Sequence, residues 1–175
     1  MVGHDVVIRE ATLVDADALG LIHRLSLQAA VPFGMSPTAL VLSVGDRAAE
    51  WREWLKVRSP DSGGQVSVAD SVHGPVGFVC VIPEPLPGST GCWFISHFSV
   101  LGSHQRQGVG RRLLLTALEG VVRRRGVKVD MLIPAGVPWA AAIEKLGGLF
   151  SGDEQTMQSG VIFSACRYSF SVFSG

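Results

Sequence analysis

Two glycines and three arginines stand close together in the segment Ser103–Arg112, whose residue types could bind a phosphate group. Gly108 and Gly110 lack the side chains that would keep a phosphate away from the backbone. If a helix begins at these glycines, its first N–H groups carry partial positive charge. The arginines add full positive charges. The segment therefore predicts a site for a pyrophosphate.

Two common kinds of phosphate site do not fit the residues that follow. A nucleoside-triphosphate loop needs Lys and then Ser or Thr after its last glycine, whereas Gly110 is followed by Arg111 and Arg112. A dinucleotide-binding turn needs a third glycine three residues later, where Leu113 stands. The remaining alternative is a glycine-rich connection between a strand and a helix that binds no ligand.

A phosphate site of this kind must be positioned by a strand before it and a helix after it. The apolar run Cys92 to Val100 predicts the strand. The residues from about Gly108 to Arg125 predict the helix, which Gly126 would end after arginines in its last turn. The basic cluster Arg123–Arg125 fits this helix end and lacks interleaved aromatic residues, so we expect no nucleic-acid partner.

The rest of the chain predicts a mixed α/β fold in the order β-α-α-β-β-β-α-β-α-β-β. No linker divides the sequence, so we expect a single domain over residues 1–175. The other strands are expected at Val6–Thr12, Gln65–Asp70, Val76–Ile82, Val127–Ile133, Leu149–Gly152 and Val161–Phe170. The other helices are expected at about Asp15–Gln28, Asp46–Val57 and Val137–Leu146.

The composition is that of a globular protein: 47% hydrophobic and 17% charged residues, with zero formal net charge. No apolar stretch reaches the roughly 18 residues of a membrane span, and the first residues do not resemble a secretion signal. We therefore expect a cytoplasmic protein without a membrane partner. The three cysteines and five histidines show no ligand spacing, so we expect no metal.

The segment Gln105–Gly110 matches the Gln/Arg-x-x-Gly-x-Gly/Ala signature of the GNAT superfamily of N-acetyltransferases, in which this loop binds the pyrophosphate of acetyl-CoA. The later segment Ile143–Gly147 is similar to the family's Tyr-Glu-Lys-Leu-Gly, with isoleucine in place of tyrosine. The resemblance implies a GNAT-like fold and transfer of an acetyl group from acetyl-CoA to a primary amine of a small molecule or peptide. A non-catalytic acyl-CoA-binding module of the same fold is the alternative, and a homodimer is left open.

The resemblance also implies where the coenzyme lies. The strand that ends near Val100 would splay from the strand Val127–Ile133, and pantetheine would lie in the gap. A backbone N–H near Val100 or Leu101 would hold the thioester oxygen and stabilise the oxyanion. The residues expected to bind the coenzyme are Phe98, Ser99, Val100, Gln105, Arg106, Gln107, Gly108, Val109, Gly110 and Arg111.

The catalytic candidates are Ser96 and His97. Relatives commonly carry a carboxylate where Ser96 stands, and this serine could order a water molecule. His97 could act as a general base because its ordinary pKa lies near neutrality. Alternation along a strand would place the two side chains on opposite faces unless a bulge intervenes.

No general acid is evident in the sequence. Ile143 stands where many relatives have the tyrosine that reprotonates the thiolate, and it cannot do so. Gly136 replaces the asparagine that often stands seven residues earlier. Tyr168, in the last strand, is expected to be a core or interface residue.

The acceptor pocket is expected to draw on the first two helices and the loop between them. Its candidate walls are Phe33, Met35, Trp51 and Trp54, although tryptophans at helical spacing also fit a core. Because no acidic cluster accompanies them, these walls favour an apolar or aromatic amine over a polycation.

Overall fold

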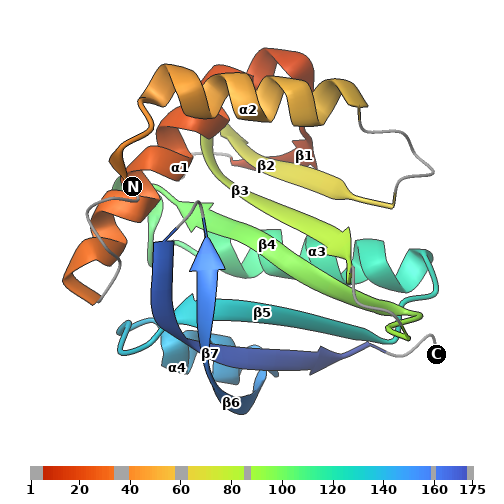
Figure 1. Cartoon of the computed structure of the whole chain (residues 1–175). Helices are drawn as coiled ribbons and strands as arrows, with labels where there is room; N and C mark the ends of the chain where they lie inside the picture. The colour runs from red at the N-terminus through yellow and green to blue at the C-terminus, as the bar shows by residue number, and fades with distance from the viewer. Residues whose placement is uncertain (1–5, 34–39, 58–62, 85–87, 159–160, 173–175) are drawn as a thin grey trace.

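Within the residues that the structure describes, a sheet of seven strands crosses the molecule, with α-helices on both of its faces (Figure 1). The structure is a computed structural model and describes residues 6–33, 40–57, 63–84, 88–158 and 161–172. The strands are β1 (Val7–Glu10), β2 (Gln65–Ser71), β3 (Gly74–Pro83), β4 (Cys92–Val100), β5 (Lys128–Pro134), β6 (Leu149–Gln158) and β7 (Val161–Ser171). The helices are α1 (Ala16–Ala30), α2 (Val44–Val57), α3 (Val109–Arg123) and α4 (Ala140–Lys145).

The predicted order of strands and helices is confirmed, and the largest difference in the predicted bounds is at the end of β6. β6 runs from Leu149 to Gln158, whereas the sequence predicted an end at Gly152. Its second half, which begins at Asp153, is mostly polar and gives little apolar signal. The strand forms because β7 supplies its hydrogen bonds as far as Gln158 in a long antiparallel hairpin.

The strand order in the sheet is β1-β2-β3-β4-β5-β7-β6, and β4 and β5 form its parallel pair. Their pairing runs from Cys92 opposite Lys128 to Ile95 opposite Met131. Beyond this point β4 continues to Val100 and β5 to Pro134, but the two strands no longer pair with each other. The splay that the family resemblance implied is therefore present.

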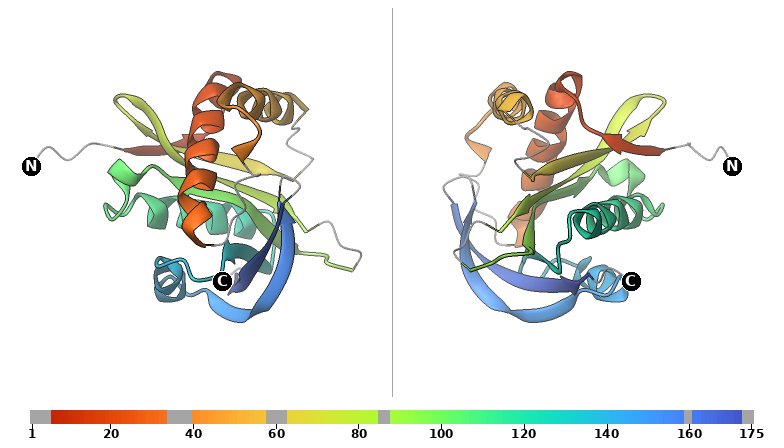
Figure 2. Two further views of the ribbon diagram at one scale, coloured as in Figure 1. Left: turned by 60° about the vertical axis from the view of Figure 1, so that its left-hand side comes forward. Right: turned by 90° about the vertical axis from the view of Figure 1, so that its right-hand side faces the viewer.

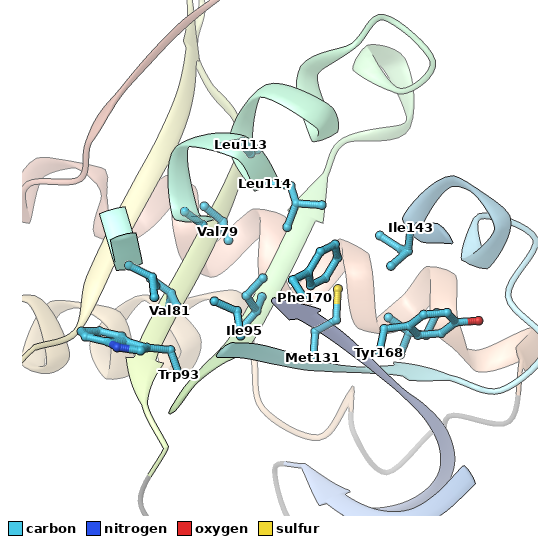
Figure 3. Close-up of a cluster of buried hydrophobic side chains, with 14 of the residues drawn as sticks. Val79, Val81, Trp93, Ile95, Leu113, Leu114, Met131, Ile143, Tyr168 and Phe170 are labelled. Atoms are coloured by element: carbon cyan, nitrogen blue, oxygen red, sulfur yellow. The ribbon is translucent and has the colours of Figure 1, made fainter. Parts of the chain in front are cut away.

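Two apolar layers hold the sheet between the helices. α1 and α2 cover one face and α3 and α4 lie on the other (Figure 2). α3 presents an apolar stripe at helical spacing that includes Val109, Leu113 and Val121. The stripe packs on Val79 and Ile95 of the central strands (Figure 3). Within the described ranges, no helix is long and apolar enough to cross a membrane.

The contact between α1 and α2 depends on a glycine. A Cβ atom on Gly20 would lie 2.6 Å from the backbone nitrogen of Ala48 and 2.9 Å from the carbonyl oxygen of Val44. Both partners are backbone atoms of α2, so they cannot turn away as a side chain would. Gly20 therefore permits the close approach of the two helices.

We expect Gly20→Ala to lower the free energy of unfolding by about 1–3 kcal/mol, because the added methyl group must push α2 away from α1. Gly45→Ala is the matched control, since its Cβ would meet only Ser43 Oγ at 3.6 Å. The control should be neutral or slightly stabilising, as alanine favours a helix. Urea unfolding measures both, and equal stability of the two variants would contradict the close contact.

Candidate active site

A cleft of about 890 Å³ opens where β4 and β5 part. Its walls come from α1, the two splayed strand ends, the turn before α3, and α4. The cleft therefore joins the predicted phosphate segment to the predicted catalytic strand. Apolar atoms dominate its lining, as in most small-molecule sites.

A β-bulge in β4 changes the direction in which His97 points. Cys80 pairs with His97 and the next residue of β3, Val81, pairs with Ile95, so Ser96 is the extra residue. Ile95 packs in the core beneath α3. Strict alternation would put His97 on that face too, but its ring contacts Trp51 on the face covered by α1 and α2. The bulge that the sequence analysis left open is therefore present, and it breaks the alternation that would otherwise separate Ser96 from His97.

Ser96 holds the imidazole of His97 through one nitrogen. Its Oγ lies 3.1 Å from His97 Nδ1 and 3.4 Å from the carbonyl oxygen of Cys80. When the hydroxyl donates to that carbonyl, its oxygen accepts from Nδ1–H, which leaves the lone pair of the imidazole on Nε2. Ser96 is thus placed to orient His97.

A second histidine, His23 of α1, packs edge-on against His97, with ring centroids 4.6 Å apart. Burial lowers the pKa of His97 to about 4, and the positive charge of Arg47 lowers it further in the same direction. Burial also lowers the pKa of His23 to about 3, with smaller effects of His97 and Arg47. Both rings are therefore neutral at pH 7.

The phosphate segment forms the start of α3 as predicted. Gly108 is the N-cap, and its φ of 81° lies in the left-handed region that favours glycine. The N–H group of Arg112 donates to Gly108 O at 3.1 Å and closes the first turn of the helix. The N–H groups of Val109, Gly110 and Arg111 therefore lie at the helix start, where an anion can accept from them.

Two glutamine side chains close the turn before α3. Gln105 Nε2 donates to Val100 O at 2.9 Å, and Gln107 Nε2 donates to Ser103 O at 2.9 Å. Arg106, which stands between them, has a φ of 62°, which is unusual for a residue other than glycine. The glutamines therefore shape the loop through their amides.

The backbone of β4 directs two N–H groups into the splay. Leu101 N–H donates to Val76 O at 2.9 Å, so it points toward β3 and cannot hold a thioester oxygen. Because backbone groups alternate along a strand, the N–H groups of Val100 and Phe98 point the other way, toward β5. Of the two residues whose N–H group was expected to hold the thioester oxygen, Leu101 is therefore excluded and Val100 remains.

The structure places eight of the ten described residues that were predicted to bind the coenzyme in the cleft wall. The other two are Val109, which is buried beneath the sheet, and Gln107. Phe33 also lines the cleft, whereas Trp51 is 5% exposed in the core, where it packs against Trp54. Met35 lies outside the described residues. The predicted tryptophan walls are therefore core residues.

Neither Ile143, which stands at the family's tyrosine position, nor Tyr168 supplies an acid in the cleft. Ile143 lines the cleft with an apolar side chain that is 2% exposed. Tyr168 packs behind it, and its hydroxyl points away from the core cluster (Figure 3) and donates to Glu144 Oε1 at 3.2 Å. Tyr168 is therefore a core residue that anchors α4.

Sequence reasoning missed His23 and Trp139 as cleft residues. His23 follows Leu19 and Ile22 on the buried face of α1, so helical spacing could have indicated a buried histidine. Trp139 lies before α4, 39% exposed at the edge of the cleft, and nothing in its sequence context indicates this place.

The charged side chains that line the described cleft all carry positive charge. Among the described residues that line it, none is Asp or Glu, and the cations are Arg106, Arg111 and Lys145. Within the same described ranges, no group of His, Cys, Asp and Glu side chains could hold a metal ion. The site can therefore hold an anion at one end and a neutral group beside the histidines.

Comparison with known proteins agrees with this geometry. The sequence model of the acetyltransferase (GNAT) family matches residues 36–142. An N-acetyltransferase from Staphylococcus aureus Mu50 has a similar structure (TM-score 0.75, 16% identity, 97% of this chain and 99% of that chain covered). A ribosomal-protein-alanine N-acetyltransferase from Brucella melitensis is also similar (TM-score 0.73, 22% identity, 94% and 99% covered).

A third similar structure is a phosphinothricin acetyltransferase from Sinorhizobium meliloti in complex with AcCoA (TM-score 0.74, 15% identity, 97% and 90% covered). At these identities the likeness establishes the fold. Among curated proteins, none matches the sequence significantly.

The neutral histidines make stability depend on pH. Below pH 6.5 the unfolded chain protonates His23, but the folded chain does not until about pH 3. The unfolded state then binds more protons, so the free energy of unfolding falls as the pH drops from 6.5, by up to about 1.4 kcal/mol per pH unit for this group.

We expect His23→Gln to reduce this slope by about 1 kcal/mol per pH unit between pH 6 and pH 5. His73→Gln, at an exposed turn between β2 and β3, is the control and should keep the wild-type slope. Urea unfolding at several pH values measures the slopes. An unchanged slope in His23→Gln would show that His23 is protonated in the folded protein.

Proposed function

Because this chain belongs to the acetyltransferase (GNAT) family, we propose that it transfers the acetyl group of acetyl-CoA to a primary amine of a small molecule or peptide. The observation that supports this most is the end of β4–β5 pairing at Ile95 and Met131, directly beside the anion-binding start of α3. Pantetheine is a chain with amide groups, and an unpaired strand edge offers backbone N–H and C=O groups with which these amides can form hydrogen bonds.

The donor is held by backbone groups over most of its length. The helix-start N–H groups near Gly110 receive the pyrophosphate, and Arg106 and Arg111 neutralise its charge. The ring of Phe98 lies against Gly110, since a Cβ there would be 3.4 Å from Phe98 Cζ. From this end, pantetheine extends along β4 toward the bulge at Ser96.

The acyl transfer takes place near the bulge. The lone pair of the amine attacks the thioester carbon, a C–N bond forms, and the carbonyl electron pair moves to oxygen. The N–H groups of Phe98 and Val100 face this gap, and one of them donates to the oxyanion. The oxyanion then reforms the carbonyl, the C–S bond breaks, and coenzyme A leaves as a thiolate.

His97 receives the proton that the amine nitrogen loses. Its Nε2 has the lone pair when Nδ1–H donates to Ser96, and its lowered pKa keeps the ring neutral before the reaction. A ring with this pKa is a weak base toward a free ammonium ion. It suits an amine that arrives neutral and becomes acidic only after the C–N bond forms.

Among the described residues that line the cleft, no tyrosine is placed to protonate the thiolate. Ile143 occupies the position from which an acid would act. A thiol has a pKa of about 8.5, so its anion is a tolerable leaving group and takes a proton from water. The enzyme therefore depends on the oxyanion N–H groups and on orientation.

The acceptor reaches the thioester over an apolar wall. Leu25, Phe33 and Trp139 are partly exposed at the cleft and favour an amine with an apolar or aromatic body. The Brucella and Sinorhizobium proteins are named for different acceptors, a ribosomal-protein alanine and phosphinothricin. The shared fold thus leaves the choice to local side chains.

We expect Gly108→Val to weaken acetyl-CoA binding at least tenfold, because the β-branched residue cannot keep the positive φ that sets the helix-start N–H groups. Gly74→Val is the matched control: its φ of 103° is also positive, and both positions have no atom within 4 Å of an added Cβ. Calorimetric titration with acetyl-CoA measures affinity, and urea unfolding shows that both variants are folded. Equal affinities would contradict the assignment of the phosphate loop.

We expect His97→Asn to lower kcat about 100-fold or more while the Kd for acetyl-CoA stays within twofold, because a general base contributes 10²–10⁴-fold in rate. Ser96→Ala should lower kcat less, since it removes only the orienting oxygen. Release of the coenzyme A thiol over a panel of amines measures turnover. Binding of acetyl-CoA without turnover of any amine would instead support the non-catalytic acyl-CoA-binding alternative.

A further inference from the structure

His23 is a buried polar side chain whose hydrogen bonds are not made. It is 5% exposed and lines the cleft from α1. Within the described part of the chain, neither Nδ1 nor Nε2 has a hydrogen-bond partner. A buried donor or acceptor without a partner destabilises the folded protein. Because His23 lines the cleft, a ligand bound there is placed to supply a missing partner.

The rings around His23 explain why protein groups do not supply these bonds. His97 meets it edge-on at 4.6 Å and Trp51 at 6.0 Å between centroids. These contacts fix the ring by packing, and neither of them gives a ring nitrogen a hydrogen bond. The neighbouring Leu19 and Ile22 are apolar and fully buried on the same helix.

The charges around the two histidines disfavour a cation. From α2, the buried Arg47 acts on both rings through its charge, and Glu50 pairs with it at 3.2 Å on the exposed side. The charged side chains that line the described cleft, Arg106, Arg111 and Lys145, are also cations. Among the described residues that line the cleft, an ammonium ion would find no carboxylate.

We propose, on the basis of the acetyl transfer proposed above, that His23 binds the acceptor directly and that the site takes it as an uncharged, weakly basic amine. A neutral imidazole offers a lone pair that can accept an N–H of the acceptor amine, and this leaves the amine's own lone pair free to attack. His97, in contact with the same ring, then takes the proton.

The proposal selects a chemical class of acceptor. An α-amino group has a pKa of about 7.7–8.0 and an ε-amino group about 10.4, so at pH 7 the neutral fraction of the first is larger by about 300-fold. α-Amino groups of amino-acid derivatives or peptide N-termini, and arylamines, are therefore expected substrates. Alkyl amines and polyamines are expected to be poor ones.

The first test compares His23→Phe with His73→Phe. The first variant keeps an aromatic ring against Trp51 and removes both nitrogens, and the second changes an exposed histidine at the turn between β2 and β3. With phenylalanine amide as acceptor, His23→Phe should raise KM at least tenfold and leave the Kd for acetyl-CoA within twofold. His73→Phe should change neither value. His23→Asn, which keeps a donor and an acceptor, should restore part of the loss.

The second test compares two acceptors with the same benzyl body, phenylalanine amide and 2-phenylethylamine. Wild-type kcat/KM at pH 7 should favour the amide by about 100-fold, in line with the neutral fractions. Equal use of the two amines, or an unchanged KM in His23→Phe, would overturn the inference while acetyl transfer itself remained.

A third measurement does not depend on turnover. In ¹⁵N-labelled protein saturated with coenzyme A, phenylalanine amide should shift the ring-nitrogen signals of His23 in the wild type. Failure of every amine to release thiol would contradict the proposed function alone. The absence of a shift at His23 would overturn the present inference, whatever the turnover.

Discussion

The structure of this site depends on the point at which two parallel strands stop pairing. β4 and β5 exchange hydrogen bonds as far as Ile95 and Met131. Beyond these residues both strands continue, but they no longer pair with each other. Backbone N–H groups left unpaired inside a protein are costly, so the gap must be filled by a ligand or water. The same divergence opens the cleft and points the N–H groups of Phe98 and Val100 into it. The donor site is therefore built mainly from backbone.

The reactive side of the cleft depends on two local irregularities. The bulge at Ser96 turns His97 from the α3 face to the face covered by α1, where it meets His23. Gly20 lets α2 approach α1 closely enough for Arg47 and Trp51 to lie behind the histidines. Together they place two neutral imidazoles side by side near the buried Arg47, which pairs with Glu50.

Much of the fold could be predicted because apolar periodicity and turn residues act locally. The bounds of β4 agreed with the prediction, and α3 began at the glycines that the phosphate segment indicated. The second half of β6 could not be predicted, because its polar residues gain their strand conformation from pairing with β7. Whether Trp51 packs in the core or lines the cleft could not be predicted either, because helical spacing is the same in both cases.

The sequence by itself determined the order of the elements and the position of the phosphate loop, because the necessary residues are neighbours in the chain. It also excluded the usual tyrosine acid, since Ile143 has no proton to give. Only the tertiary structure decided which side chains meet beside the bulge of β4. A one-residue bulge reverses the facing of His97, and the partners His23 and Arg47 come from separate helices. Such contacts join residues distant in the chain, and no local pattern specifies them.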